Sequence, residues 1–208
     1  MVLVIDYDER GRIGKMYEVI DALTLKQSQE VFRLCLQEAT YFTMTVFPRC
    51  ESDWERVTFD KTLENRLEPY CIGKKHLVEG RWGNVLVGDI CDVNPGIQLK
   101  IFKVTPETSA ILLEFYDTIY LEHSDDVQAS FHQIGKEEEV HTKLATLSDI
   151  FFLDAERKVM VETVAFEGMV GIYEDNEVLL NFVKRTPNIW HHWEDDEGFR
   201  EPVEWEEV

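Results

Sequence analysis

The chain has 208 residues, a formal net charge of −20, and a composition that is 44% hydrophobic and 12% aromatic. This length and apolar content predict a globular chain with an ordinary core and exclude a disordered one. No run of about eighteen apolar residues occurs and no basic region precedes the N-terminal apolar residues, so we expect a cytoplasmic protein without a signal peptide or membrane span.

The negative charge is concentrated in the second half of the chain. Residues 1–104 contain 16 acidic and 14 basic residues, whereas residues 105–208 contain 25 acidic and 7 basic ones. The two halves therefore carry net charges of −2 and −18. Acidic surfaces repel phosphate backbones and anionic lipid headgroups, so the charge argues against direct nucleic-acid or membrane binding. It favours a solvated acidic face or a surface for a basic protein.

The first elements predicted along the chain are a hairpin and a helix. Residues 2–7 and 15–20 are short apolar runs separated by a glycine-bearing turn, which is typical of two paired strands. Thr24 followed by Gln27 matches a capping box. The apolar side chains that follow have helical spacing and predict an amphipathic helix over residues 25–39.

Three strands and a short helix are predicted between residues 41 and 104. Residues 41–47 are rich in β-branched and aromatic side chains and predict a strand, whereas residues 61–68 predict a short helix. Residues 85–90 and 97–104 predict two further strands, joined through an Asn-Pro-Gly turn at 94–96.

The middle of the chain predicts a second main helix and then a break. Pro106 stands at the first helical position and opens an apolar helix that extends to residue 122. Residues 123–126 interrupt the pattern and are the best candidate for a boundary. Residues 127–147 predict a strand followed by a charged helix.

The remaining apolar runs predict a β-meander and complete the expected fold. They are residues 150–153, 159–166, 170–173 and 178–183, separated by turn-like residues. The sequence thus predicts an α+β fold, in which one or more antiparallel-rich sheets pack against two main helices. We expect one domain over residues 1–183, divisible into sub-lobes 1–122 and 127–183, and a tail over 184–208.

The tail is acidic and rich in tryptophan. Aromatic rings supply contact area and carboxylates steer a basic partner, so this segment is a candidate protein-binding surface. Its candidate binding residues are Trp190, Trp193, Glu194, Asp195, Asp196, Glu197 and Trp205. The simpler alternative is that the rings pack onto the protein's own sheet and leave the acids in water.

His191 and His192 are weak candidates for a metal site. Imidazole beside carboxylates suits zinc or nickel. Adjacent residues in a strand point to opposite faces, however, which argues against a shared site. The sequence therefore predicts neither a metal site nor another cofactor.

Three functions remain open at this stage. In size, charge and expected compartment the chain resembles small acidic proteins that neutralise a basic partner, such as bacterial immunity proteins directed against toxin nucleases. That resemblance is one of class and assigns no residues. We therefore expect an acidic binding module for a basic protein. The alternatives are an enzyme with a dispersed, metal-dependent hydrolytic site and a structural subunit with a solvated acidic face.

Overall fold

The structure of the chain is a computed structural model. It describes residues 15–19, 23–46, 62–77, 81–82, 85–86, 97–115, 150–164, 169–193 and 202–208, to which all structural statements refer.

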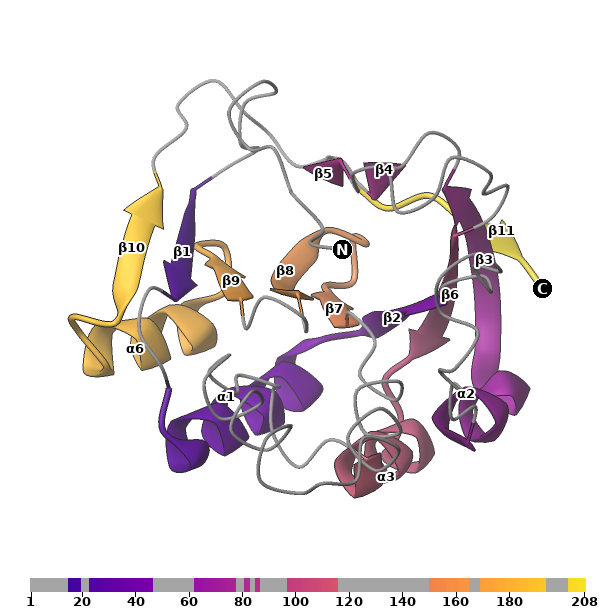
Figure 1. The fold of residues 1–208 in the computed structure, drawn as a ribbon, viewed down its shortest axis with the longest axis horizontal. Helices are drawn as coiled ribbons and strands as arrows, with labels where there is room; N and C mark the ends of the chain where they lie inside the picture. The colour runs from indigo at the N-terminus through magenta and orange to yellow at the C-terminus, as the bar shows by residue number, and fades with distance from the viewer. Residues whose placement is uncertain are drawn as a thin grey trace, which may run out of the picture.

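Nine strands form one sheet in which every neighbouring pair is antiparallel (Figure 1). They are β1 (Met16–Val19), β2 (Tyr41–Val46), β3 (Cys71–Leu77), β6 (Ile97–Lys103), β7 (Ile150–Leu153), β8 (Val159–Val164), β9 (Met169–Tyr173), β10 (Trp190–Trp193) and β11 (Glu206–Glu207). Their order across the sheet is β10-β1-β9-β8-β7-β2-β6-β3-β11. Two short strands, β4 (Arg81–Trp82) and β5 (Val85–Leu86), pair separately.

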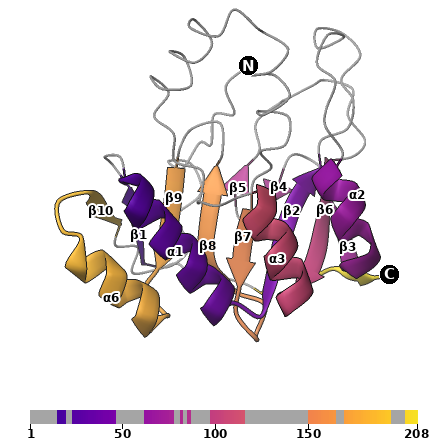
Figure 2. The ribbon, with the colours of Figure 1, turned by 90° about the horizontal axis from the view of Figure 1, so that it is seen from below.

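The described helices form a layer on one face of the sheet (Figure 2). They are α1 (Leu25–Glu38), α2 (Thr62–Leu67), α3 (Pro106–Phe115) and α6 (Glu177–Arg185), with a 3-10 turn, η1 (Glu68–Tyr70), after α2. In the part of the chain that is described, no helix combines the length and apolar character needed to cross a membrane.

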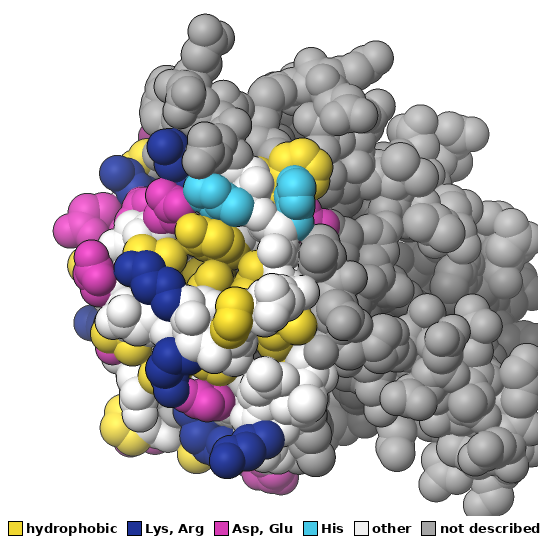
Figure 3. All heavy atoms as spheres, turned by 90° about the vertical axis from the view of Figure 1, so that its left-hand side faces the viewer, with side chains coloured by type: hydrophobic (Ala, Val, Ile, Leu, Met, Phe, Trp, Pro, Cys, Tyr) yellow, Lys and Arg dark blue, Asp and Glu magenta, His cyan; other side chains and the backbone are white. Residues whose placement is uncertain are grey.

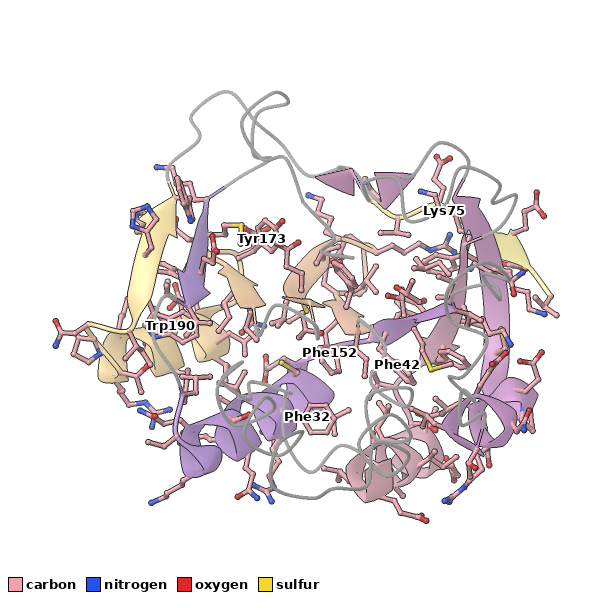
Figure 4. The ribbon with its side chains drawn as sticks, viewed as in Figure 1. Phe32, Phe42, Lys75, Phe152, Tyr173 and Trp190 are labelled. Atoms are coloured by element: carbon pink, nitrogen blue, oxygen red, sulfur yellow. The ribbon has the colours of Figure 1, made fainter. Side chains whose placement is uncertain are left out.

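The main core lies between this helix layer and the sheet. Phe32 on α1 meets Phe152 on β7 edge to face, with ring centroids 5.9 Å apart. Phe42 on β2 stacks on Phe102 of β6 at 5.0 Å. All four rings are fully buried, and burial of such large apolar side chains is the main stabilising contribution to the fold. Figure 4 shows Phe32, Phe42 and Phe152 on the helix side of the sheet.

A second apolar cluster lies on the opposite face, which we call the open face because none of the described helices covers it. It includes Leu99 and Ile101 on β6, Phe151 on β7, and Val203 from the C-terminal residues. Figure 4 places Tyr173 and Lys75 on this side, away from the labelled phenylalanines. The C-terminal residues therefore belong to the packing of the sheet.

The α+β class and several predicted elements are confirmed. The capping box is formed, since the Thr24 hydroxyl accepts from the backbone of Gln27 and the Gln27 side chain accepts from the Thr24 N–H. β7, β8 and β9 are a meander of antiparallel neighbours, as the three apolar runs predict. The sheet packs against four described helices, where the sequence predicts two main ones.

Two local predictions are wrong. Residues 178–183, expected as a strand, lie inside α6, because Asn176 caps that helix by accepting from the N–H groups of Val178 and Leu179. The predicted hairpin of residues 2–7 with residues 15–20 is not formed along Met16–Glu18. There β1 pairs with β9 on one side and with β10 on the other.

Other predictions fall partly or wholly outside the described residues. The predicted turn at 94–96 lies outside the described residues. The strands that it was expected to join do not pair with each other along their described residues, since β5 pairs with β4 and β6 pairs with β2 and β3. Further predicted segments that lie outside the described residues are 2–7, 116–122, 123–126 and 127–147.

Candidate functional site

The predicted tail begins in the last turn of α6 (Glu177–Arg185), and its first candidate binding residues lie in β10, an outer strand of the described sheet. β10 pairs with β1, from Trp193 opposite Met16 to Trp190 opposite Val19. Four residues of extended backbone therefore fix the direction of every side chain in this segment. Because side chains alternate along a strand, Trp190 and His192 face the helix layer while His191 and Trp193 face the open side.

The two histidines do not share a site. The ring of His192 stacks on Tyr17 at 4.4 Å, and its Nε2 lies 2.6 Å from Glu174 Oε1. His191 lies on the other face, with its ring edge-on to Trp193 at 4.1 Å. Among the described residues, no three histidine, cysteine or acidic side chains are grouped so that they could hold a metal ion.

The tryptophans of β10 contact the protein's own side chains. The Trp190 Nε1–H donates to Thr186 Oγ1 at 3.0 Å, and the Trp193 Nε1–H donates to Glu18 Oε2 at 2.7 Å. Both rings are half-buried. They consequently hold the edge strand in place and leave only part of their area for contact with another molecule.

Trp205 anchors the C-terminal residues on the open face in a similar way. The Arg157 guanidinium lies over its ring at 3.9 Å, and Tyr41 meets it edge to face at 5.4 Å. Nearby, the Val203 N–H donates to the carbonyl of Arg157 at 2.9 Å. Arg157 itself has a positive φ of 69°, a costly conformation for a residue with a side chain, and these contacts help to hold it.

The carboxylates beside Trp205 point into solvent. Glu204, Glu206 and Glu207 are exposed, whereas Val203 is 3% exposed and the Trp205 ring is half-buried. The predicted binding acids Glu194, Asp195, Asp196 and Glu197 lie outside the described residues. At the other end of the sheet, the surface around β10 and α6 mixes acidic, basic and apolar side chains (Figure 3). The C-terminal residues therefore present three exposed carboxylates beside the packed Trp205 ring.

Sequence analysis missed an ion-pair cluster around Lys100. Lys100 on β6 is 5% exposed, and its Nζ lies 2.7 Å from Glu64 Oε1 and 2.5 Å from Glu68 Oε2. Lys74 adds a contact with Glu68 at 3.5 Å. The four-residue spacing of Glu64 and Glu68 near a helix was the available signal, because such residues share one face. A lysine held protonated between two carboxylates is suited to joining elements and unsuited to nucleophilic chemistry.

The thiol of Cys35 also has a structural role. It is fully buried on α1, as its place on the apolar side of the predicted helix implies, and burial raises its pKa far above the usual range. Such a thiol stays protonated and packs as a small apolar group.

Comparison of the chain with protein-family models, with curated proteins and with solved structures finds no significant match in any of the three. The functional argument therefore depends on the geometry and charge of this chain.

Proposed function

We propose that this chain is an acidic cytoplasmic module that binds a basic protein, and that its C-terminal residues form part of the contact surface. The observation that carries the proposal is the opposite orientation of rings and carboxylates in residues 202–208. Trp205 packs inward on Tyr41 and Arg157, while Glu204, Glu206 and Glu207 are exposed. An anchored backbone presents these charges at little cost in conformational entropy on binding.

The charge distribution supports the same function. Residues 105–208 carry a net charge of −18, and an excess of surface charge of one sign accelerates encounter with an oppositely charged partner. A partner that uses its basic surface to contact phosphates would be neutralised when this module covers that surface. In this proposal the carboxylates provide most of the attraction, and the tryptophans chiefly hold them in place.

The test compares two variants with the same change in net charge. The first is Glu204→Gln, Glu206→Gln and Glu207→Gln, which removes three negative charges from the proposed surface. The second adds three positive charges on the exposed faces of α1, α3 and α6, at Gln37→Lys, Ala110→Lys and Asn181→Lys. Only the first should weaken binding if local charge matters more than net charge.

The measurement is capture of partner protein from lysate of the source cell at 50 mM and 500 mM NaCl. We expect the unmodified chain to retain a basic protein at low salt and release it at high salt. The Gln variant should bind it about tenfold more weakly, which corresponds to about 1.4 kcal/mol, and the Lys variant should resemble the unmodified chain in the salt dependence of capture. Equal capture by the two variants, or capture indifferent to salt, would refute the proposed surface.

No observation favours the hydrolytic alternative. His191 and His192 face opposite sides of the sheet and are each in contact with neighbouring side chains, so the pair does not form the centre of such a site.

A further inference from the structure

Three polar groups on the open face lack partners among the described residues. Thr43 and Thr45 on β2 are 0% and 3% exposed, and neither hydroxyl oxygen has a hydrogen-bond partner there. Lys75 on β3 is half-buried, and no ion pair or hydrogen bond of its side chain occurs within the described part of the chain. Buried polar groups are nearly always satisfied, so a pair of such hydroxyls on one strand requires an explanation.

Strand register places the three groups near one another. Thr45 pairs with Leu99, and Leu99 pairs with Lys75, so the three residues form one row across β2, β6 and β3. Thr43 lies two residues along β2 on the same face, about 7 Å from Thr45. Lys75 and Thr45 are two strands apart, about 10 Å between Cα atoms, and the long lysine side chain can reach across much of this distance. Figure 4 shows Lys75 on the open side of the sheet.

Lys75 differs from the nearby lysines of the same sheet. Lys100 contacts two glutamates, and Lys74 contacts one of them. Lys75 lies on the opposite face and forms no ion pair with a described carboxylate, although the chain has 41 acidic residues. Among the described residues, its positive charge is therefore not paired with a carboxylate.

The chemistry of the three groups fits an oxyanion. Two hydroxyls can donate hydrogen bonds and the ammonium supplies a positive charge, beside the apolar Leu99 and Ile101. In such surroundings charge-assisted hydrogen bonds are stronger than in water. A water molecule could satisfy the hydroxyls, whereas an oxyanion would also attract the partly exposed ammonium. We propose that Thr43, Thr45 and Lys75 bind a small oxyanion of the phosphate type.

The net charge of the chain does not prevent such binding. At physiological ionic strength, charges separated by more than about 8 Å are largely screened. The first 104 residues, which contain all three groups, carry a net charge of only −2. The local charge at this position is set by Lys75 together with Glu206 and Glu207, which pair with Lys74 and Gly73 of the same strand.

The first test is titration of the full chain with inorganic phosphate and with phenyl phosphate, followed by isothermal calorimetry at constant ionic strength. Thr45→Val and Lys75→Met each remove one proposed ligand group, and Lys103→Met removes an exposed lysine from the end of β6 as a control. We expect saturable binding that falls at least tenfold in the first two variants and is unchanged in the control. Absence of saturable binding, or equal affinity in all variants, would overturn the proposal.

The two ligands distinguish a free phosphate ion from a phosphomonoester as the source of the anion. Thermal unfolding distinguishes a binding site from two buried hydroxyls that have no ligand. Tighter binding of inorganic phosphate indicates the free ion, whereas tighter binding of phenyl phosphate indicates a phosphomonoester. Phosphate should raise the unfolding temperature of the unmodified chain and leave that of the Thr43→Val, Thr45→Val variant unchanged, because a ligand stabilises only a state that binds it. An equal rise in both proteins would contradict the site even if calorimetry detects binding.

Discussion

Lys100 shows how one buried cation joins two elements. Burial lowers the pKa of a lysine, but the hydrogen bonds that Lys100 donates to Glu64 and Glu68 outweigh that effect and raise its pKa above the usual range. The same hydrogen bond lowers the pKa of Glu68. Lys100 and Glu68 therefore remain ionised at neutral pH, and the cluster ties α2 and η1 to β6.

Substitution of Glu68 by Gln should change how stability depends on pH. A carboxyl whose pKa is lowered by folding contributes stability above its unfolded pKa of about 4.5, and loses that contribution as the pH falls through the folded pKa. Urea unfolding should therefore show that the variant is less stable by about 1 kcal/mol at pH 7. The difference should shrink between pH 5 and pH 3.

Glu156→Gln is the matched control, since Glu156 is exposed in the turn between β7 and β8. It should leave the pH dependence of the unmodified chain in place. If Glu68→Gln and Glu156→Gln behaved alike from pH 7 to pH 3, the cluster around Lys100 would not have the stabilising role assigned to it.

At the scale of elements, β11 is held by its two-residue ladder with β3 and by the packing of the preceding residue, Trp205. Gly73 on β3 lies beneath Trp205, and a Cβ at residue 73 would be 2.7 Å from Trp205 Nε1. Gly73→Ala should therefore displace the ring and lower the free energy of unfolding by about 1–3 kcal/mol. Urea unfolding followed by tryptophan fluorescence measures both effects.

A double-mutant cycle with Trp205→Ala tests whether the ring is the cause. Once the indole is absent, Gly73→Ala should cost much less, because the new methyl group then has space. The same cost in both backgrounds would mean that the effect comes from the backbone of β3 and not from Trp205.

Local patterns in the sequence were sufficient for some elements but misleading for α6. The helix α1 was predictable because its capping box and apolar spacing are both contained within residues 24–39. The run 178–183 is apolar like a strand, yet Asn176, Glu177 and the basic residues Lys184 and Arg185 are helix-boundary signals. Those flanking residues determine the helix in spite of the apolar run.

The edges of the sheet and the candidate sites could not be predicted from local patterns. β10 pairs with β1 and β11 pairs with β3, in each case across more than a hundred residues of chain. β3 itself contains Lys74 and Lys75, so it lacks the apolar alternation of a typical strand. The acids of the tail were recognised from composition, but the inward packing of Trp205 needed the three-dimensional partners Tyr41 and Arg157.

At the scale of the whole molecule, the net charge of −20 should make stability depend on salt. Repulsion among carboxylates opposes the compact state and is screened by added ions. Raising NaCl from 20 to 500 mM should increase the unfolding temperature by roughly 2–4 °C, which corresponds to about 1 kcal/mol for a chain of this size. Differential scanning calorimetry measures the shift.

The Glu204→Gln, Glu206→Gln, Glu207→Gln variant provides the comparison for this salt effect. With three fewer negative charges, it should start at a higher unfolding temperature in 20 mM NaCl and gain less from added salt. An unfolding temperature that falls with salt in the unmodified chain would show that favourable ion pairs, such as those of Lys100, outweigh the repulsion.

The position of β10 and β11 has a consequence for the order of folding. Both outer strands of the described sheet come from residues 190–207, while the strands between them come from residues 16–173. During synthesis the inner strands therefore leave the ribosome with two unpaired edges, and such edges can pair with strands of other chains. The edge at β1 cannot close until residues 190–193 have emerged, nor the edge at β3 until residues 206–207 have. The chain therefore passes through an interval in which it depends on rapid completion or on chaperones to remain unaggregated.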